Sequence, residues 1–283
     1  MSRPTKATRG IARACALAGA ATAALVVPAD ASDPVTTGPS SSQAPYVVPV
    51  APGVRTISIL TVGDAIDDYA LVGKPDGMGV LADDEGGFRL FLNHELRPDQ
   101  GIERTHGGTA GAFVSEWSID ADTLAVTAGR DLIETAWFWT GTGYETRTGE
   151  AANLNRFCSA DLPAKKAFWD PKSGTGYNGR LFMDGEEADD EGRAFAHLVT
   201  GSGMRESYEL PALGNTAWEN VVAAPGAGRT TVVVGMDDTN PGQVYVYVGT
   251  KQADGTPIER AGLTGGSLYA VARAPATALA MSS

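Results

Sequence analysis

The sequence predicts an all-β protein built as a β-propeller, on three observations. Short runs of β-branched and aromatic residues are separated by turn residues, and almost no stretch has the period of a helix. Glycine is abundant, with 35 residues in a chain of 283, which suits many tight turns. In addition, three strand-like runs end in an acidic group of the same style, which indicates an internal repeat.

The N-terminal residues 1–31 have the pattern of a secretory signal peptide. Four basic residues precede the apolar run Ala14–Val27, and Ala29-Asp30-Ala31 is a small-x-small cleavage site. We therefore expect a secreted or periplasmic protein. Residues 32–53 are rich in Pro, Ser and Thr and predict a linker without a folded element, so the propeller domain is expected at 54–283.

Alternation and β-branched residues predict strands throughout that domain. The runs are, in order, Arg55–Val62, Gly79–Ala82, Phe88–Asn93, Ala112–Ile119, Leu124–Thr127, Arg180–Met183, Ala194–Val199, Val221–Ala223, Thr230–Met236, Gln243–Gly249 and Ser267–Val271. The acidic and glycine-rich residues 83–87 between two of these runs predict a hairpin turn.

The repeat is defined by the acids that follow three of the strands. Glu95 and Glu187 are 92 residues apart, and Glu187 and Asp238 are 51 apart. A unit of roughly 40–50 residues, counted twice in the first interval, matches a propeller blade of four strands. Each of these strands has a preceding partner, at 76–81, 155–161 and 216–222.

In a propeller those partners would be the innermost strands, which line the central channel. The polar residues that they would place there are Asp76, Cys158 and Glu219. Converging carboxylates raise one another's pKa unless a cation lies between them. Oxygen ligands favour calcium or magnesium, and a thiolate among them points to iron or zinc as well.

Simpler interpretations stay open for these residues. An acid at the end of a strand is often a solvated turn residue. Cys158 is the only cysteine once residues 1–31 are removed, so it has no intrachain disulfide partner. It is either a buried apolar residue, an intermolecular crosslink or a metal ligand.

Charge and motifs exclude several classes of function. The formal net charge is −12, and removing residues 1–31 makes the chain more acidic, so binding to nucleic acid or to a membrane surface is not expected. The chain has no GxSxG, HExxH, Walker or Rossmann glycine signature, which argues against serine hydrolases, zincins and nucleotide-binding enzymes.

An ordered set of segments across residues 57–271 resembles the PhoX-like family, also catalogued as domain of unknown function 839. The segments are GKPDGMG at 73–79, LNHEL at 92–96, GAFVS at 111–115, RFCSADL at 156–162, GEE at 185–187, EGRAFAH at 191–197, WEN at 218–220, GMDD at 235–238 and VYVY at 244–247. Characterised members of the family are secreted bacterial alkaline phosphatases.

The resemblance implies a six-bladed propeller that holds calcium and iron in its channel. It implies that Cys158 ligates the iron and that the carboxylate ligands are among Glu95, Glu186, Glu187, Glu219, Asp237 and Asp238. The reaction implied is hydrolysis of a small phosphomonoester. A calcium-binding propeller without catalysis, acting as a secreted interaction module, and a hydrolase of another ester are the alternatives. Six blades need more residues than this chain has, so fewer blades, a fragment or closure by self-association are all open.

Overall fold

The computed structural model describes residues 34–84 and 86–271, so the expected signal peptide at 1–31 and the last residues of the expected domain lie outside it. The described part contains twenty strands, four short 3-10 helices and one α-helix of four residues, α1 (Pro257–Arg260). None of the helices in this part is long and apolar enough to cross a bilayer. The expected all-β class is thus confirmed.

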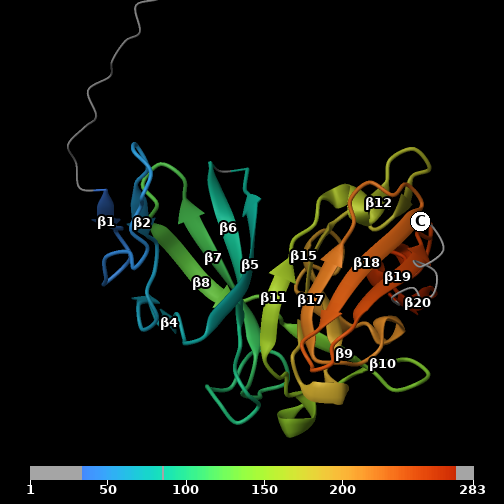
Figure 1. Cartoon of the computed structure of the whole chain (residues 1–283). Coiled ribbons are helices and arrows are strands. Elements are labelled where there is room, and N and C mark those ends of the chain that lie inside the picture. Colours follow the sequence, from blue (N-terminus) through green and yellow to red (C-terminus); the bar gives the residue numbers. More distant parts are fainter. Residues whose placement is uncertain (1–33, 85, 272–283) are drawn as a thin grey trace, which may run out of the picture.

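Three antiparallel sheets form the body of the protein (Figure 1). The first sheet consists of β5 (Pro75–Ala82), β6 (Gly87–His94), β7 (Phe113–Asp120) and β8 (Val126–Asp131), in chain order. The third sheet repeats this arrangement with β17 (Trp218–Ala223), β18 (Thr230–Asp237), β19 (Val244–Thr250) and β20 (Ser267–Ala270).

The second sheet contains the same four-stranded unit and two additional strands. Its unit consists of β11 (Phe157–Asp161), β14 (Arg180–Glu186), β15 (Ala194–Thr200) and β16 (Glu206–Glu209). The additional strand β9 (Thr135–Trp139) pairs parallel to β16, and β10 (Tyr144–Thr146) pairs with β9 at the edge.

The remaining elements are short. They are β1 (Val35–Thr37), β2 (Thr56–Ser58), β3 (Ala65–Ile66), β4 (Tyr69–Ala70), β12 (Trp169–Asp170), β13 (Thr175–Gly176), and the 3-10 helices η1 (Gly149–Ala152), η2 (Lys165–Ala167), η3 (Asp189–Glu191) and η4 (Pro211–Leu213). Since β1 pairs in parallel with β2, the expectation that residues 32–53 hold no folded element is wrong. The polar composition of that segment did not reveal this long-range pairing.

The first strands of the three units lie beside one another, with β11 between β5 and β17 (Figure 1). Small residues allow this close approach. A Cβ added at Gly77 would lie 2.2 Å from the backbone nitrogen of Ala160, and one at Gly185 would lie 2.3 Å from the Cβ of Trp218. The sheets therefore meet closely at their inner strands, with the apolar cores between them.

One core fills the space between the first and second sheets and another fills the space between the second and third. The first of these includes Phe91, Phe157 and Phe182, and the other includes Met183 and Trp218, all of them fully or almost fully buried. A third, smaller cluster lies where residues 59–71 cover the outer side of the first sheet. Each sheet face that meets another sheet is thus apolar.

The predicted strand runs agree with the structure in place and order. The three predicted partner strands are β5, β11 and β17, and each pairs with the acid-terminated strand that was assigned to it. The main errors are at strand boundaries: the run Arg55–Val62 contains only the three residues of β2, and β14 continues to Glu186 instead of ending at Met183. The strands β9, β10 and β16 were not predicted.

Candidate metal site

The candidate site is built from three equivalent pairs of strands. In each pair the register of the inner strand shifts close to its start, between Pro75 and Met78, between Phe157 and Ala160, and between Trp218 and Asn220. A shift of this kind bends the strand and re-aims the side chain at the bulge. The residues at these three bulges are Asp76, Cys158 and Glu219.

An acid directly follows the second strand of each pair. Glu95 follows β6, Glu187 follows β14 and Asp238 follows β18. The backbone N–H of each acid donates a hydrogen bond to the carbonyl oxygen of the residue directly before the partner strand. The distance from nitrogen to oxygen is 3.0 Å for Glu95, 3.0 Å for Glu187 and 2.9 Å for Asp238. The accepting residues are Lys74, Arg156 and Ala217. One acid and one bulge residue are therefore held in the same relation three times.

Because the inner strands lie side by side, these pairs converge on one region. The ligand atoms of Glu95, Cys158 and Glu187 lie within 4.8 Å of one another, and so do those of Glu187, Glu219 and Asp238. Glu187 belongs to both groups. We call the six residues Asp76, Glu95, Cys158, Glu187, Glu219 and Asp238 the acidic cluster.

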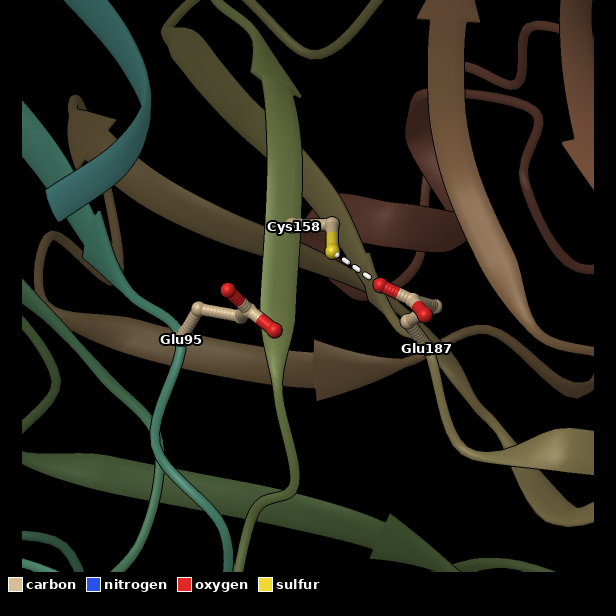
Figure 2. Close-up of side chains that lie close together, drawn as sticks. All are labelled: Glu95, Cys158 and Glu187. Atoms are coloured by element: carbon tan, nitrogen blue, oxygen red, sulfur yellow. Dashed lines mark hydrogen bonds between the residues drawn. The ribbon is translucent and has the colours of Figure 1, made fainter. Parts of the chain in front are cut away.

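The cysteine lies at the centre of this cluster. The Cys158 thiol donates a hydrogen bond to Oε2 of Glu187 at 2.6 Å, and Glu95 extends from the neighbouring segment on the other side of β11 (Figure 2). Cys158 is 4% exposed, whereas the side chains of Glu95 and Glu187 are 18% and 15% exposed. The thiol is thus covered and the carboxylates around it face solvent.

Burial and mutual repulsion act together on the groups of the acidic cluster. Burial raises the pKa of Asp76, and the charges of Glu95 and Glu187 raise it further. Burial is also the largest cause of the raised pKa of Glu219, followed by Glu187 and Asp238. The Cys158 thiol has its pKa raised by burial and by its contact with Glu187, so the free protein holds it protonated.

Basic side chains neutralise only one side of the cluster. The Arg156 guanidinium lies 2.8 Å from Oε1 of Glu95 and 2.6 Å from Oε1 of Glu187, and Lys74 lies 3.9 Å from Glu95. Within the described residues, neither Glu219 nor Asp238 forms an ion pair. Negative charge is therefore least compensated on the side of Glu219 and Asp238.

The structure does not bring Glu186 and Asp237 to the cluster, contrary to our expectation from the sequence. Each immediately precedes a cluster acid, and successive residues of a strand point to opposite faces. Glu186 is 2% exposed and forms an ion pair with Arg193 at 2.6 Å. Asp237 accepts a hydrogen bond from Thr239 at 2.9 Å. The other acids near Glu187, Asp189 and Asp190, are exposed in η3, as a solvated turn would be.

A second polar centre consists of Asp184, His197 and Ser207 in the second sheet. His197 Nε2 lies 2.8 Å from Oδ1 of Asp184, and its Nδ1 lies 2.8 Å from the Ser207 hydroxyl. The residue types are those of a catalytic triad. However, none of the three side chains is more than 1% exposed, so no substrate reaches Ser207. The group joins β14, β15 and β16 inside the sheet, and His197 is a core histidine with both ring nitrogens hydrogen-bonded.

Sequence reasoning missed Arg156 as a residue of the site. A signal for Arg156 exists: it directly precedes β11, just as Lys74 directly precedes β5, and both backbones are left-handed, with φ values of 48° and 51°. His106, in the loop between β6 and β7, is fully buried.

No family model, no curated protein and no solved structure matches this chain.

Proposed function

We propose that the acidic cluster binds metal cations and that the protein is an extracytoplasmic phosphatase-like hydrolase of phosphomonoesters. The observation that carries the metal site is the convergence of the three bulge-and-acid pairs on two groups of ligand atoms, Glu95–Cys158–Glu187 and Glu187–Glu219–Asp238. Within each group the ligand atoms lie within 4.8 Å of one another. Carboxylates held this close together repel one another, and a bound cation removes that repulsion.

The donor set fits two kinds of cation. Glu187, Glu219 and Asp238 form an all-oxygen group in which only Glu187 has a basic partner among the described residues, and such a group suits calcium. Glu95, Cys158 and Glu187 add a thiol, which as a thiolate suits iron. The other two expected ligands, Glu186 and Asp237, take no part in this proposal because they face away from the cluster.

The three four-stranded units support a β-propeller as the architecture. Each unit runs from an inner strand outward, and the inner strands β5, β11 and β17 adjoin one another. In a propeller this places the inner-strand residues on the central channel. The three bulge residues then share that channel, which accounts for their convergence.

The choice of reaction rests on the resemblance to PhoX-like phosphatases and on the charges beside the cluster. Bound cations would neutralise the phosphoryl oxygens and activate the attacking oxygen. In this chain, Lys74 and Arg156 border the carboxylates, so an anionic substrate would meet positive charge on that side. Both basic groups are tied to Glu95, which fixes where they point.

Metal analysis and a phosphatase assay on the purified protein test this proposal. We expect calcium and iron to copurify, and we expect hydrolysis of a chromogenic phosphomonoester that stops when a chelator is added. A Cys158→Ala variant should lose iron and retain calcium. The control is Asp190→Asn, an exposed acid close in sequence to Glu187 and outside the cluster, which should keep both metals and activity. A wild-type protein that binds neither metal refutes the metal site.

A calcium-binding module without catalysis is the second candidate. It is favoured by the asymmetry of the cluster. Two of the three carboxylates in the all-oxygen group, Glu219 and Asp238, have no ion-pair partner among the described residues, whereas Arg156 pairs with both carboxylates of the thiol group. Bound calcium without iron and without phosphomonoester hydrolysis identifies this function instead.

A further inference from the structure

The outer face of the third sheet is apolar, and no segment of the described chain packs over it. Its register aligns Val222, Val234, Val246 and Tyr269 in one row across all four strands. Val222 and Tyr269 are 42% and 57% exposed, and Met236 and Val244 in the next row are also exposed. Contiguous apolar surface of this kind on a soluble protein marks an interaction site.

The same row in the second sheet is buried beneath the third sheet. There the register aligns Asp161, Met183, Ala196 and Tyr208. Met183 and Ala196 are fully buried in the core that also contains Trp218 of the third sheet. The two rows are equivalent because Met183 precedes Glu187, and Val234 precedes Asp238, by the same number of residues.

The first sheet follows the same rule. Phe91 stands at the equivalent position before Glu95, is fully buried, and packs against Phe182 of the second sheet with ring centroids 6.0 Å apart. Each sheet therefore uses this face to pack against the sheet that follows it. The third sheet presents the face with the matching residues to solvent.

The complementary surface is the part of the opposite side of the first sheet, over β5 and β6, that residues 59–71 leave open. Leu90 there is equivalent to Phe182, which faces the preceding sheet. A groove of about 470 Å³ opens on this side, lined by Met78, Leu90, Leu92, Trp117 and Ile119 together with residues of the N-terminal arm. Met78 and the adjacent Val80 are 58% and 56% exposed. No charged side chain lines the groove.

We infer that a second copy of this chain docks here, with the outer face of its third sheet against the groove side of the first sheet. On the third sheet the contact uses the same face with which the first and second sheets pack against the sheet that follows. On the first sheet it is confined to the open part over β5 and β6, because residues 59–71 already cover Trp117 and Ile119. Both surfaces are uncharged in a chain with a formal net charge of −12, so they are where two copies can meet with least repulsion. Each copy has both surfaces, so two copies satisfy both contacts around one twofold axis and bring six sheets together.

This inference is independent of the metal site, because it rests on apolar rows outside the acidic cluster. Light scattering coupled to size-exclusion chromatography tests it on the full chain. We expect twice the chain mass for the wild type. Val234→Glu places a charge in the centre of the contact and should weaken association by at least roughly 100-fold. Ile102→Glu, at a residue that is 66% exposed outside both surfaces, is the matched control and should remain dimeric.

A second variant determines which surfaces meet. Val80→Glu changes only the groove side and should also give a monomer. A mixture of the Val234→Glu and Val80→Glu proteins retains one intact contact and should recover part of the dimer. Near-ultraviolet circular dichroism identical to that of the wild type shows that each variant is folded. A monomeric wild type overturns the proposal, as does a Val80→Glu protein that dimerises as tightly as the wild type.

Discussion

The buried polar side chains of the second sheet and the acidic cluster differ in how their charges are compensated. Inside the second sheet, Glu186 is paired with Arg193, and His197 bridges Asp184 and Ser207. In the acidic cluster, Arg156 compensates Glu95 and Glu187, but Glu219 and Asp238 have no basic partner among the described residues. A buried ion is tolerated only when it is paired. The paired groups inside the second sheet therefore contribute to the fold, whereas the unpaired carboxylates of the acidic cluster are ready to receive a cation.

Removing Arg193 gives the largest effect that this contrast predicts. An Arg193→Leu variant leaves Glu186 buried without its counter-charge, which typically costs about 3–5 kcal/mol. Chemical denaturation measures the loss in the free energy of unfolding. The double variant Arg193→Leu/Glu186→Leu removes both charges and should recover most of that loss. If the single variant is as stable as the wild type, the ion pair does not support the fold.

Acid should destabilise the folded protein through His106. This side chain is fully buried, and neither of its ring nitrogens has a hydrogen-bond partner among the described residues. Burial lowers the pKa of His106 to about 4 from its usual value of 6.5. The unfolded chain therefore binds a proton that the folded chain does not between these two values, and stability falls as the pH falls through this window. A shift of this size corresponds to roughly 3 kcal/mol.

A His106→Leu variant provides the comparison for that window. Its free energy of unfolding should depend less steeply on pH between about 6.5 and 4 than that of the wild type, because one titrating group has been removed. Denaturation series at several pH values measure the difference. Parallel pH profiles for the two proteins would show that His106 does not titrate in this way.

The smallest effect on stability is expected in the acidic cluster. Glu219→Gln removes a charge that repels Glu187 and Asp238 and that has no basic partner, so metal-free stability should stay within about 1 kcal/mol of the wild type or rise. The same change should weaken calcium binding, measured by isothermal titration. A large loss of metal-free stability would place Glu219 with the structural groups instead.

The sequence was sufficient to predict most of the longer strands and the three strand pairs of the site because their signals are local. Alternation and β-branched residues mark β6, β14 and β18, and the spacing of Glu95, Glu187 and Asp238 identified the repeat. The sequence did not distinguish between adjacent acids, so Glu186 and Asp237 were expected as ligands together with Glu187 and Asp238. A one-residue difference moves a side chain to the other face of a strand, and the register that decides this depends on bulges in the partner strand.

Long-range contacts account for the rest of what the sequence did not reveal. Arg156 became part of the site only when β5 and β11 were placed beside each other, which brings Glu95 to its guanidinium. Likewise, β1 lies in a segment of linker composition but pairs with β2, which is 21 positions further along the chain. Neither the contact of Arg156 with Glu95 nor the pairing of β1 with β2 can be predicted from amino-acid composition.

Glu187 belongs to both groups of ligand atoms, and this shared membership couples their occupancy. Two ions that use the same carboxylate do not bind independently: the first alters the affinity for the second, and by thermodynamic reciprocity the second alters the affinity for the first by the same factor. A titration of the cluster with a single metal should therefore deviate from a simple hyperbola. The sign of the deviation then reports whether the bridging carboxylate draws the two ions together or their mutual repulsion dominates.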